Sequence, residues 1–322
     1  MGHHAEMALL LGRGENLNAV YAPECVDSLV GAFTPRLDGV SVDWADLTRS
    51  WNPAKEEVYE LDSDIHLADP ALAVTMGDWD HSDVLEIRDA VAPWFGNSLS
   101  ANHEEPATPY ADAYQYYTLW EIFERVAGAF RERDRYEALA SIRADLLSTV
   151  ETNLPPEDER PSVAMVLPST SDDSMWAYRT NAEGYYAAHT RPLGAIDAMA
   201  EASVDTGAQV DFETLVEADP DVLTILGGVV DMHDMPAIRE RLADDPVASE
   251  VTAVQDGRVH AQGTRHQGPL VTLFQLEMGA KQLYPDRFGE WPTYESGPYP
   301  ELPEDERLFD YDRVAGVVTG DI

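Results

Sequence analysis

The residues best suited to bind a ligand lie in a short turn, where Arg265, His266 and Gln267 stand between two glycines. A short strand-like run, Val259 to Ala261, precedes the turn and predicts a strand. Pro269 follows where a helix can begin, because the first helical turn does not need the N–H that proline lacks. A turn between a strand end and a helix start is where open α/β sheets bind ligands. A polar turn that contacts only water is the alternative explanation of this pattern.

A second group of candidate contacts, Trp176, Tyr178 and Arg179, follows the apolar run Val163 to Leu167. Aromatic faces stack on bulky ligands, and a guanidinium donates charge-assisted hydrogen bonds to anionic ones. We therefore expect these three side chains to form one wall of a binding site. A cross-strand packing ladder is the alternative role for the same residue types.

Three aromatic residues of the first half are weaker candidates for the opposite wall. Tyr21 and Phe95 each stand at or near the end of a short apolar run, and Trp51 opens a segment with a helix start. For any single aromatic side chain, packing in a core is the commoner role.

Apolar runs and helical periodicity alternate in both halves of the chain, which predicts an α/β fold. The middle of the sequence predicts two long helices, the first at 114–130 and the second ending near residue 151, with a proline-rich connector after them. Residues 270–278 predict a helix with a largely apolar stripe facing inward. The expected strands are 19–22, 40–42, 65–67, 92–95, 163–167, 222–226 and 259–261.

Four segments and the turn at 263–268 carry a family resemblance. The segments are WNPAKEEVYELDSDIHLADP (51–70), YQYYTLWEIFERVAGAFRERDRYEAL (114–139), DFETLVEADPDVLTIL (211–226) and the final DRVAGVVTGDI. They resemble substrate-binding proteins of ABC transporters, of the siderophore and cobalamin type, and among these the haloarchaeal iron(III)-hydroxamate binding proteins. The resemblance implies two lobes with mainly parallel sheets, joined by a long rigid helix, and a ligand cleft between the lobes. It divides the chain into an N-terminal lobe (1–131), a linking helix (132–153) and a C-terminal lobe (154–322).

The resemblance also implies two contacts with a membrane permease, because each lobe of such proteins presents an exposed glutamate to the permease dimer. Matching the motifs residue by residue assigns these roles to Glu56 and Glu213. A purely structural explanation also exists, since Asn52 with Pro53 and then Asp211 can cap helices whose first turns favour carboxylates. The partners expected from the resemblance are the ABC permease dimer, its ATPase and a small iron chelate.

A ferric siderophore of the hydroxamate type is the ligand that the resemblance favours, and no resident cofactor is expected. Such chelates are bulky, partly apolar and often anionic, which suits aromatic faces combined with arginine. Cobalamin, haem and a bare metal ion remain alternatives. Asp231, His233 and Asp234 form a possible metal cluster, although in a chain this rich in aspartate a solvated loop is the favoured explanation. His233 with His266 is the one suggestive histidine pair.

The charge of the chain excludes some partners. Its 60 acidic and 21 basic residues give a formal net charge of −39, and Lys55 and Lys281 are the two lysines. This excess repels nucleic acids and anionic membrane surfaces. An ordinary apolar fraction under such a surface predicts adaptation to high salt, which screens the self-repulsion. An acidic protein from an ordinary environment is the alternative.

The start of the sequence lacks two features that the resemblance implies, an export signal and a first strand. Residues 1–18 predict a short helix instead, with His3 and His4 as terminal scatter and not a metal site. We expect a protein on the outer face of the cell membrane, lipid-anchored when preceded by its signal; a cytosolic interaction protein is the alternative. Motifs for phosphate loops, nucleophile elbows and zinc hydrolases do not occur in the sequence, so we expect a binding protein and not an enzyme.

Overall fold

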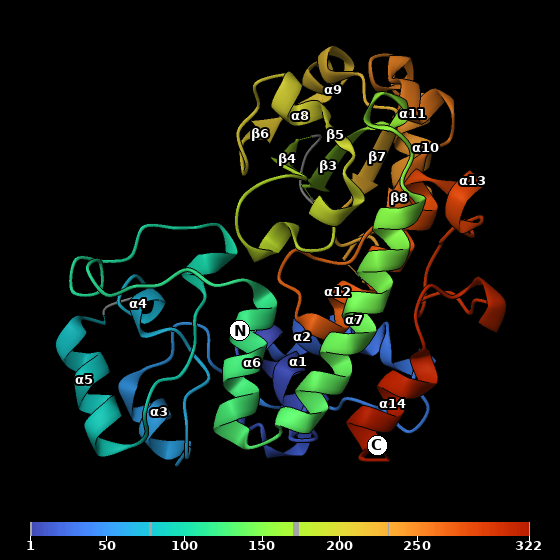
Figure 1. Cartoon of the computed structure of the whole chain (residues 1–322). Coiled ribbons are helices and arrows are strands. Elements are labelled where there is room, and N and C mark those ends of the chain that lie inside the picture. The colour runs from blue at the N-terminus through green and yellow to red at the C-terminus, as the bar shows by residue number, and fades with distance from the viewer. Residues whose placement is uncertain (1, 77–78, 170–173, 231, 322) are drawn as a thin grey trace.

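The computed structural model describes residues 2–76, 79–169, 174–230 and 232–321, and it has an α/β fold. Two groups of strands lie in different halves of the chain, and a long helix, α7 (Arg133–Asn153), runs between them. Figure 1 shows α7 reaching from the region of α6 and α14 to the sheet of the second half. A helix ending near residue 151 is expected from the sequence, and α7 ends at Asn153.

The second half contains a mixed sheet. Its strand order is β6-β4-β3-β7-β8, and β5 pairs with β3. β3 pairs in parallel with β7, which pairs in parallel with β8, whereas β4 is antiparallel to β3 and β6. β3 and β7 lie inside the sheet, and their residues are mostly apolar and buried, with Ser162 and Thr224 as the polar exceptions. The expected strands at 163–167, 222–226 and 259–261 are confirmed as β3 (Ser162–Pro168), β7 (Val222–Ile225) and β8 (Val259–Ala261). The sheet also contains β4 (Met175–Tyr178), β5 (Ile196–Asp197) and β6 (Gln209–Val210), which are not among the expected strands.

Aspartates begin several of the helices that surround this sheet. The side chains of Asp211, Asp234 and Asp310 each accept a hydrogen bond from the backbone N–H three residues on, so they satisfy a donor that the first turn leaves free. The helices of the second half are α8 (Ala198–Glu201), α9 (Phe212–Ala218), α10 (Met235–Asp244), α11 (Thr252–Gln255), α12 (Pro269–Leu283), α13 (Pro285–Phe288) and α14 (Tyr311–Thr319).

The first half has fewer strands than the sequence predicts. β1 (Ala19–Val20) pairs in parallel with β2 (Thr48–Arg49), and a single parallel bridge joins His66 to Trp94. The expected strand at 40–42 is wrong, because Val40 packs into the core from a loop and β2 supplies the partner of β1. The helices are α1 (Gly2–Leu10), α2 (Pro23–Gly31), α3 (Lys55–Glu60), α4 (Pro70–Ala73), α5 (His81–Ala90) and α6 (Leu119–Phe130).

α6 begins later than the sequence predicts. Thr118 caps its N-terminus: the Thr118 hydroxyl accepts from the Glu121 N–H, and the Glu121 carboxylate accepts from the Thr118 N–H, which forms a capping box. Residues 114–117, before Thr118, are not helical, and one of them, Tyr114, donates its hydroxyl hydrogen to Asp69 at 2.5 Å. The predicted start at residue 114 is therefore wrong by about one turn.

α12 is the centre of the core. All of its residues are buried, so the expected apolar stripe on one side is too narrow a description. α1, α6 and α7 contact it from the first half and the middle of the chain. None of the helices in the described part of the chain is long and apolar enough to cross a membrane.

Candidate ligand-binding site

Arg265 lies between two aromatic rings in the turn that precedes α12. Its guanidinium carbon is 4.2 Å from the centre of the Tyr178 ring and 4.8 Å from the centre of the Tyr186 ring. Such contacts favour a cation over the faces of the rings. No carboxylate in the described residues forms an ion pair with Arg265, so its N–H groups are available to an anionic ligand.

His266 joins this arrangement to the first half of the chain. Its Nδ1 lies 2.6 Å from the Tyr186 hydroxyl, and its ring centre lies 6.5 Å from that of Tyr21. Tyr21 in turn packs edge-on against Trp51 at 4.8 Å, and Trp51 is 48% exposed. We call these residues the Arg265 cluster: Tyr21, Trp51, Tyr178, Tyr186, Arg265 and His266.

The other three predicted contacts lie outside the cluster. Trp176 shares a face of β4 with Tyr178 and packs beside it against a small apolar group. Arg179 lies on the opposite face of the strand, where it donates to the Val204 carbonyl at 3.0 Å and pairs with Asp197 at 3.6 Å. Phe95 is half-buried, packs against the core and donates its backbone N–H to the His66 carbonyl.

Burial and charge set the ionisation of the cluster. Burial, assisted by the positive charge of Arg265, lowers the pKa of His266 to about 4, so the imidazole is neutral near pH 7. Burial raises the pKa of the Tyr186 and Tyr21 hydroxyls, which stay protonated. The positive charge is therefore concentrated on Arg265. The site can bind a bulky, partly apolar anion by stacking and by charge-assisted hydrogen bonds.

The turn at 263–268 is held rigidly by buried polar side chains. Gln275 of α12 accepts from the Gly263 N–H at 2.6 Å and donates to the Thr264 carbonyl at 3.3 Å. Glu6 of α1 accepts from the Gly268 N–H at 2.6 Å and the Val271 N–H at 3.0 Å, which caps the N-terminus of α12. The sequence does not reveal the role of Glu6, because its partners are more than 260 residues away.

Tyr185 is a further contact between the two halves that the sequence reasoning missed. Gly184 has a φ of 89° and approaches Ala101 so closely that no Cβ fits, which places the next residues against the first half. The Tyr185 hydroxyl lies 3.1 Å from His3 Nε2. The Gly-Tyr-Tyr sequence at 184–186 is the signal that could have identified this loop.

His3 and His4 are buried structural residues, so their interpretation as terminal scatter is wrong. Each is 1% exposed, and their rings pack against each other at 4.1 Å. Burial lowers the pKa of both imidazoles well below the ordinary value. They are buried because α1 is surrounded by α12, α6 and α14, so that every residue of this helix is buried.

The structure describes two residues of the possible metal cluster, His233 and Asp234, and Asp234 has a structural role. Asp234 caps α10 and His233 is half-buried, whereas Asp231 lies outside the described residues. Among the residues that the structure describes, no group of three or more histidine, cysteine or carboxylate side chains is arranged to hold a metal ion.

Glu6 makes the stability of this site depend on pH. Its complete burial raises the pKa from 4.5 to about 7, so between these values the folded state binds the proton more tightly than the unfolded state. Stability from this group is present below about pH 4.5 and is lost as the pH rises through 7. We expect wild type to lose up to about 3 kcal/mol relative to Glu6→Gln between pH 5 and pH 8. Urea unfolding of both proteins at the two pH values measures this; equal changes would contradict the assignment.

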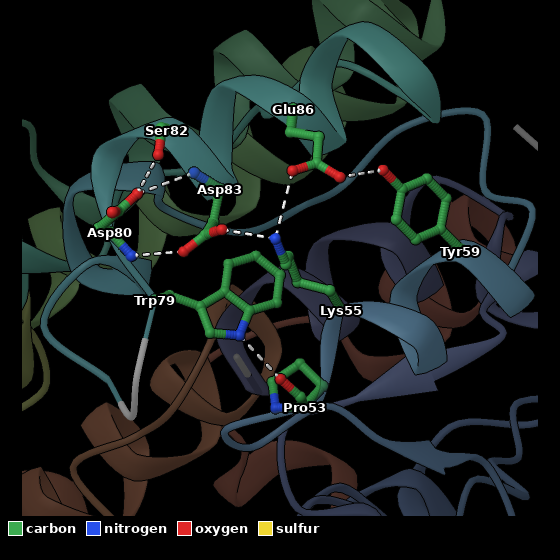
Figure 2. Close-up of polar contacts among 8 residues, drawn as sticks. All are labelled: Pro53, Lys55, Tyr59, Trp79, Asp80, Ser82, Asp83 and Glu86. Carbon is green, nitrogen blue, oxygen red and sulfur yellow. Dashed lines mark hydrogen bonds and ion pairs between the residues drawn. The ribbon is translucent and has the colours of Figure 1, made fainter.

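The two predicted permease contacts lie on exposed first turns. On α3, Lys55 pairs with Asp83 at 2.6 Å and Glu86 at 3.2 Å, and Tyr59 donates to Glu86, so the helix is fixed to α5 (Figure 2). Glu57 of α3 accepts from the Ala54 N–H. Glu56 and Glu213 are exposed, and neither forms a hydrogen bond or ion pair within the described residues.

A cavity of about 670 Å³ lies in the first half of the chain, and residues from His4 to Phe130 line it. It includes Tyr21 but no residue of the second half. This cavity therefore shares only Tyr21 with the Arg265 cluster, because the cluster draws on both halves of the chain.

Comparison with solved structures shows the same fold at low identity. The catecholate siderophore binding protein FeuA from Bacillus subtilis, solved with ferri-bacillibactin, is 15% identical, with a TM-score of 0.58 over 87% of this chain and 89% of its own. FhuD from Vibrio cholerae, bound to Fe³⁺-Desferal, is 15% identical, with a TM-score of 0.57 over 87% of this chain and 94% of its own. The haem-binding protein HutB from Vibrio cholerae is 15% identical, with a TM-score of 0.59 over 88% of this chain and 96% of its own.

No curated protein sequence matches this chain. The family model described as periplasmic binding protein, however, matches residues 94–263, which is just over half of the chain and includes β3 to β8. The chain therefore belongs to the periplasmic binding protein family, whose members are non-enzymatic components of transport.

Proposed function

We propose that this protein is the substrate-binding component of an ABC importer and that it captures a ferric siderophore of the hydroxamate type. The ligand would lie between the two halves of the chain, against the Arg265 cluster. FeuA and FhuD are named as siderophore-binding proteins and HutB as a haem-binding protein, which supports this ligand class for the shared fold.

The observation that carries the proposal is the environment of Arg265. The chain has a net charge of −39, yet no carboxylate in the described residues pairs with the Arg265 guanidinium. This guanidinium can therefore form an ion pair with an anionic ligand. Its two flanking rings, Tyr178 and Tyr186, supply stacking surface, and Tyr21 with Trp51 supplies more from the other half. A ferric hydroxamate, which presents both apolar and polar surface, matches this combination.

Haem is the second candidate, and a specific observation supports it. His266 is neutral near pH 7, and its Nδ1 is hydrogen-bonded to the Tyr186 hydroxyl. In the tautomer that carries its proton on Nδ1, the lone pair of Nε2 could serve as an axial ligand to the haem iron. A haem complex would show a Soret band that a ferric siderophore lacks.

The proposal is tested by titrating tryptophan fluorescence in molar KCl with ferrioxamine, ferrichrome, cobalamin and haem in turn. Saturable quenching by a ferric hydroxamate alone would support the hydroxamate assignment, helped by the exposed Trp51 as reporter. Saturable quenching by haem alone, or by cobalamin alone, would replace the ferric hydroxamate with that compound as the assigned ligand. Absence of binding by all four would contradict the iron-uptake function.

Delivery to the membrane would use Glu56 and Glu213 as contacts with the permease dimer, which acts with its ATPase. α3 and α9, which carry them, lie in different halves of the chain (Figure 1). The clamp of Lys55 onto α5 holds the first of these helices in place (Figure 2). We place the protein at the outer face of the cell membrane, lipid-anchored in its mature form.

A further inference from the structure

A chain of buried polar side chains leads from the turn at 263–268 to a histidine in another segment. Gln275 of α12 is hydrogen-bonded to Gln267, and Gln267 is hydrogen-bonded to Nδ1 of His189. All three side chains are fully or almost fully buried. Gln267 stands two residues after Arg265, and His189 stands three residues after Tyr186, one of the rings that flank Arg265. The chain of hydrogen bonds therefore links the segments that carry Arg265 and Tyr186.

The direction of every hydrogen bond in this chain is fixed by the backbone N–H of Gly263, because an N–H can only donate. Gln275 accepts that hydrogen through Oε1 at 2.6 Å, so its amide nitrogen donates to the Thr264 carbonyl and to Oε1 of Gln267. The amide nitrogen of Gln267 must then donate to Nδ1 of His189. This Nδ1 can accept only in the neutral tautomer that carries its proton on Nε2.

The other neutral tautomer of His189 conflicts with the chain. With its proton on Nδ1, the ring could donate to the Tyr186 carbonyl, but Gln267 would then have to turn its own carbonyl oxygen toward the histidine. Gln275 would have to turn as well, so that its NH₂ group would face the N–H of Gly263. Two donors would meet in a buried position, and a buried donor without an acceptor costs more than a typical hydrogen bond contributes.

Burial makes the tautomer, and not protonation, the variable that matters near pH 7. His189 is 1% exposed, and burial lowers the pKa of its imidazole to about 3, which a hydrogen bond with the Tyr186 backbone opposes only in part. The ring is therefore neutral at ordinary pH. Where its one N–H hydrogen lies then decides whether Gln267 has an acceptor for its amide hydrogen.

We propose that His189 is a positioning residue for the turn at 263–268. The lone pair on its Nδ1 sets the orientation of Gln267 and, through it, the orientation of Gln275. These two glutamines hold the backbone of the turn that carries Arg265. The inference rests on the proposed function, because the turn matters for transport only if Arg265 contacts the ligand.

The tautomer is tested by long-range proton–nitrogen correlation spectra of the protein labelled with nitrogen-15 histidine. We expect Nδ1 of His189 to resonate as an unprotonated acceptor at pH 7 and Nε2 to carry the hydrogen. The spectrum of His189→Asn lacks this signal and so assigns it. A hydrogen on Nδ1 in the wild-type protein would overturn the proposal.

Two variants separate the hydrogen bond from packing. His189→Leu keeps most of the side-chain volume but removes the acceptor, whereas His189→Asn is smaller but places an oxygen where Nδ1 lies. We expect backbone amide exchange at Gly263 to accelerate at least about tenfold in His189→Leu and less than about threefold in His189→Asn. The amide of Gln262 donates to the Ile225 carbonyl in the sheet at 2.8 Å and serves as the internal reference.

Equal acceleration at Gly263 in both variants, or a larger one in His189→Asn, would show a packing role and overturn the proposal. Unchanged exchange in His189→Leu would also overturn it.

Titration with ferrioxamine then connects the turn to binding. His189→Leu should bind at least about fivefold more weakly than wild type, and His189→Asn should recover most of that loss. Equal affinity of His189→Leu and wild type would overturn the link to the ligand. If wild type itself does not bind ferrioxamine, the proposed ligand fails, whereas the tautomer and the exchange rates, which are measured without ligand, still decide whether His189 positions the turn.

Discussion

Replacing Glu277 with leucine is expected to destabilise the protein by roughly 3–5 kcal/mol. Glu277 is fully buried in α12, and its carboxylate accepts from the hydroxyls of Tyr299 and Tyr311 and from the Leu308 N–H. These bonds attach the segment beyond α13 to the central helix. The substitution leaves the Tyr311 hydroxyl and the partly buried Leu308 N–H without this acceptor, and it leaves the Tyr299 hydroxyl with only the Phe274 carbonyl at 3.4 Å. Each buried donor that loses its acceptor costs about 1–3 kcal/mol. Urea unfolding in molar KCl measures the loss.

Two further variants separate the polar network from general packing. Adding Tyr299→Phe and Tyr311→Phe to Glu277→Leu removes the orphaned hydroxyls, so part of the lost stability should return. Glu301→Leu, at an exposed position of the same segment, should change stability by less than about 0.5 kcal/mol. A loss below 1 kcal/mol for Glu277→Leu, or no recovery in the triple variant, would contradict this account of the network.

The double variant Glu56→Ala/Glu213→Ala is expected to bind ligand with unchanged affinity but to abolish uptake. Both carboxylates are exposed and without hydrogen bonds or ion pairs in the described residues, so their removal leaves the fold and the Arg265 cluster intact. What is lost is the charge that the permease would recognise. Uptake of the labelled ferric ligand by whole cells, alongside fluorescence titration of the purified variant, measures the two effects separately.

The matched control for this experiment lies on the same two helices. Glu60→Ala/Glu217→Ala removes the same charge from exposed positions near the opposite ends of α3 and α9. We expect normal uptake from it. Normal uptake by the Glu56/Glu213 variant, or equal loss in both variants, would refute the docking assignment.

Local sequence signals predict the second half well. β3, β7 and β8 are short, mostly apolar runs ended by turn residues, and α12 starts at Pro269, which marks it in the sequence. These elements follow from residues close in sequence. The turn with Arg265 and His266 lies between β8 and α12, as the strand and helix signals predict. Two residues of the Arg265 cluster could therefore be identified from the sequence alone.

The remainder depends on contacts between distant segments. Glu6 caps α12 from the other end of the chain, and Tyr185 meets His3 across the two halves. Neither pairing leaves a periodic or local pattern, so the burial of His3 and His4 could not be foreseen. Arg179 shows the reverse case, because its position beside Tyr178 suggests a common role, whereas alternation along β4 directs it to Asp197.

Tryptophan fluorescence titration of Arg265→Ala and Arg179→Ala, with the ligand that wild type binds, tests the central claim most directly. Both variants remove one guanidinium from the same region, but Arg265 contacts the aromatic rings of the cluster and Arg179 is committed to Asp197 and Val204. We predict at least a tenfold loss of affinity for Arg265→Ala, equivalent to about 1.4 kcal/mol, and less than a threefold change for Arg179→Ala. Unchanged affinity in Arg265→Ala would contradict the claim that this cluster binds the transported ligand.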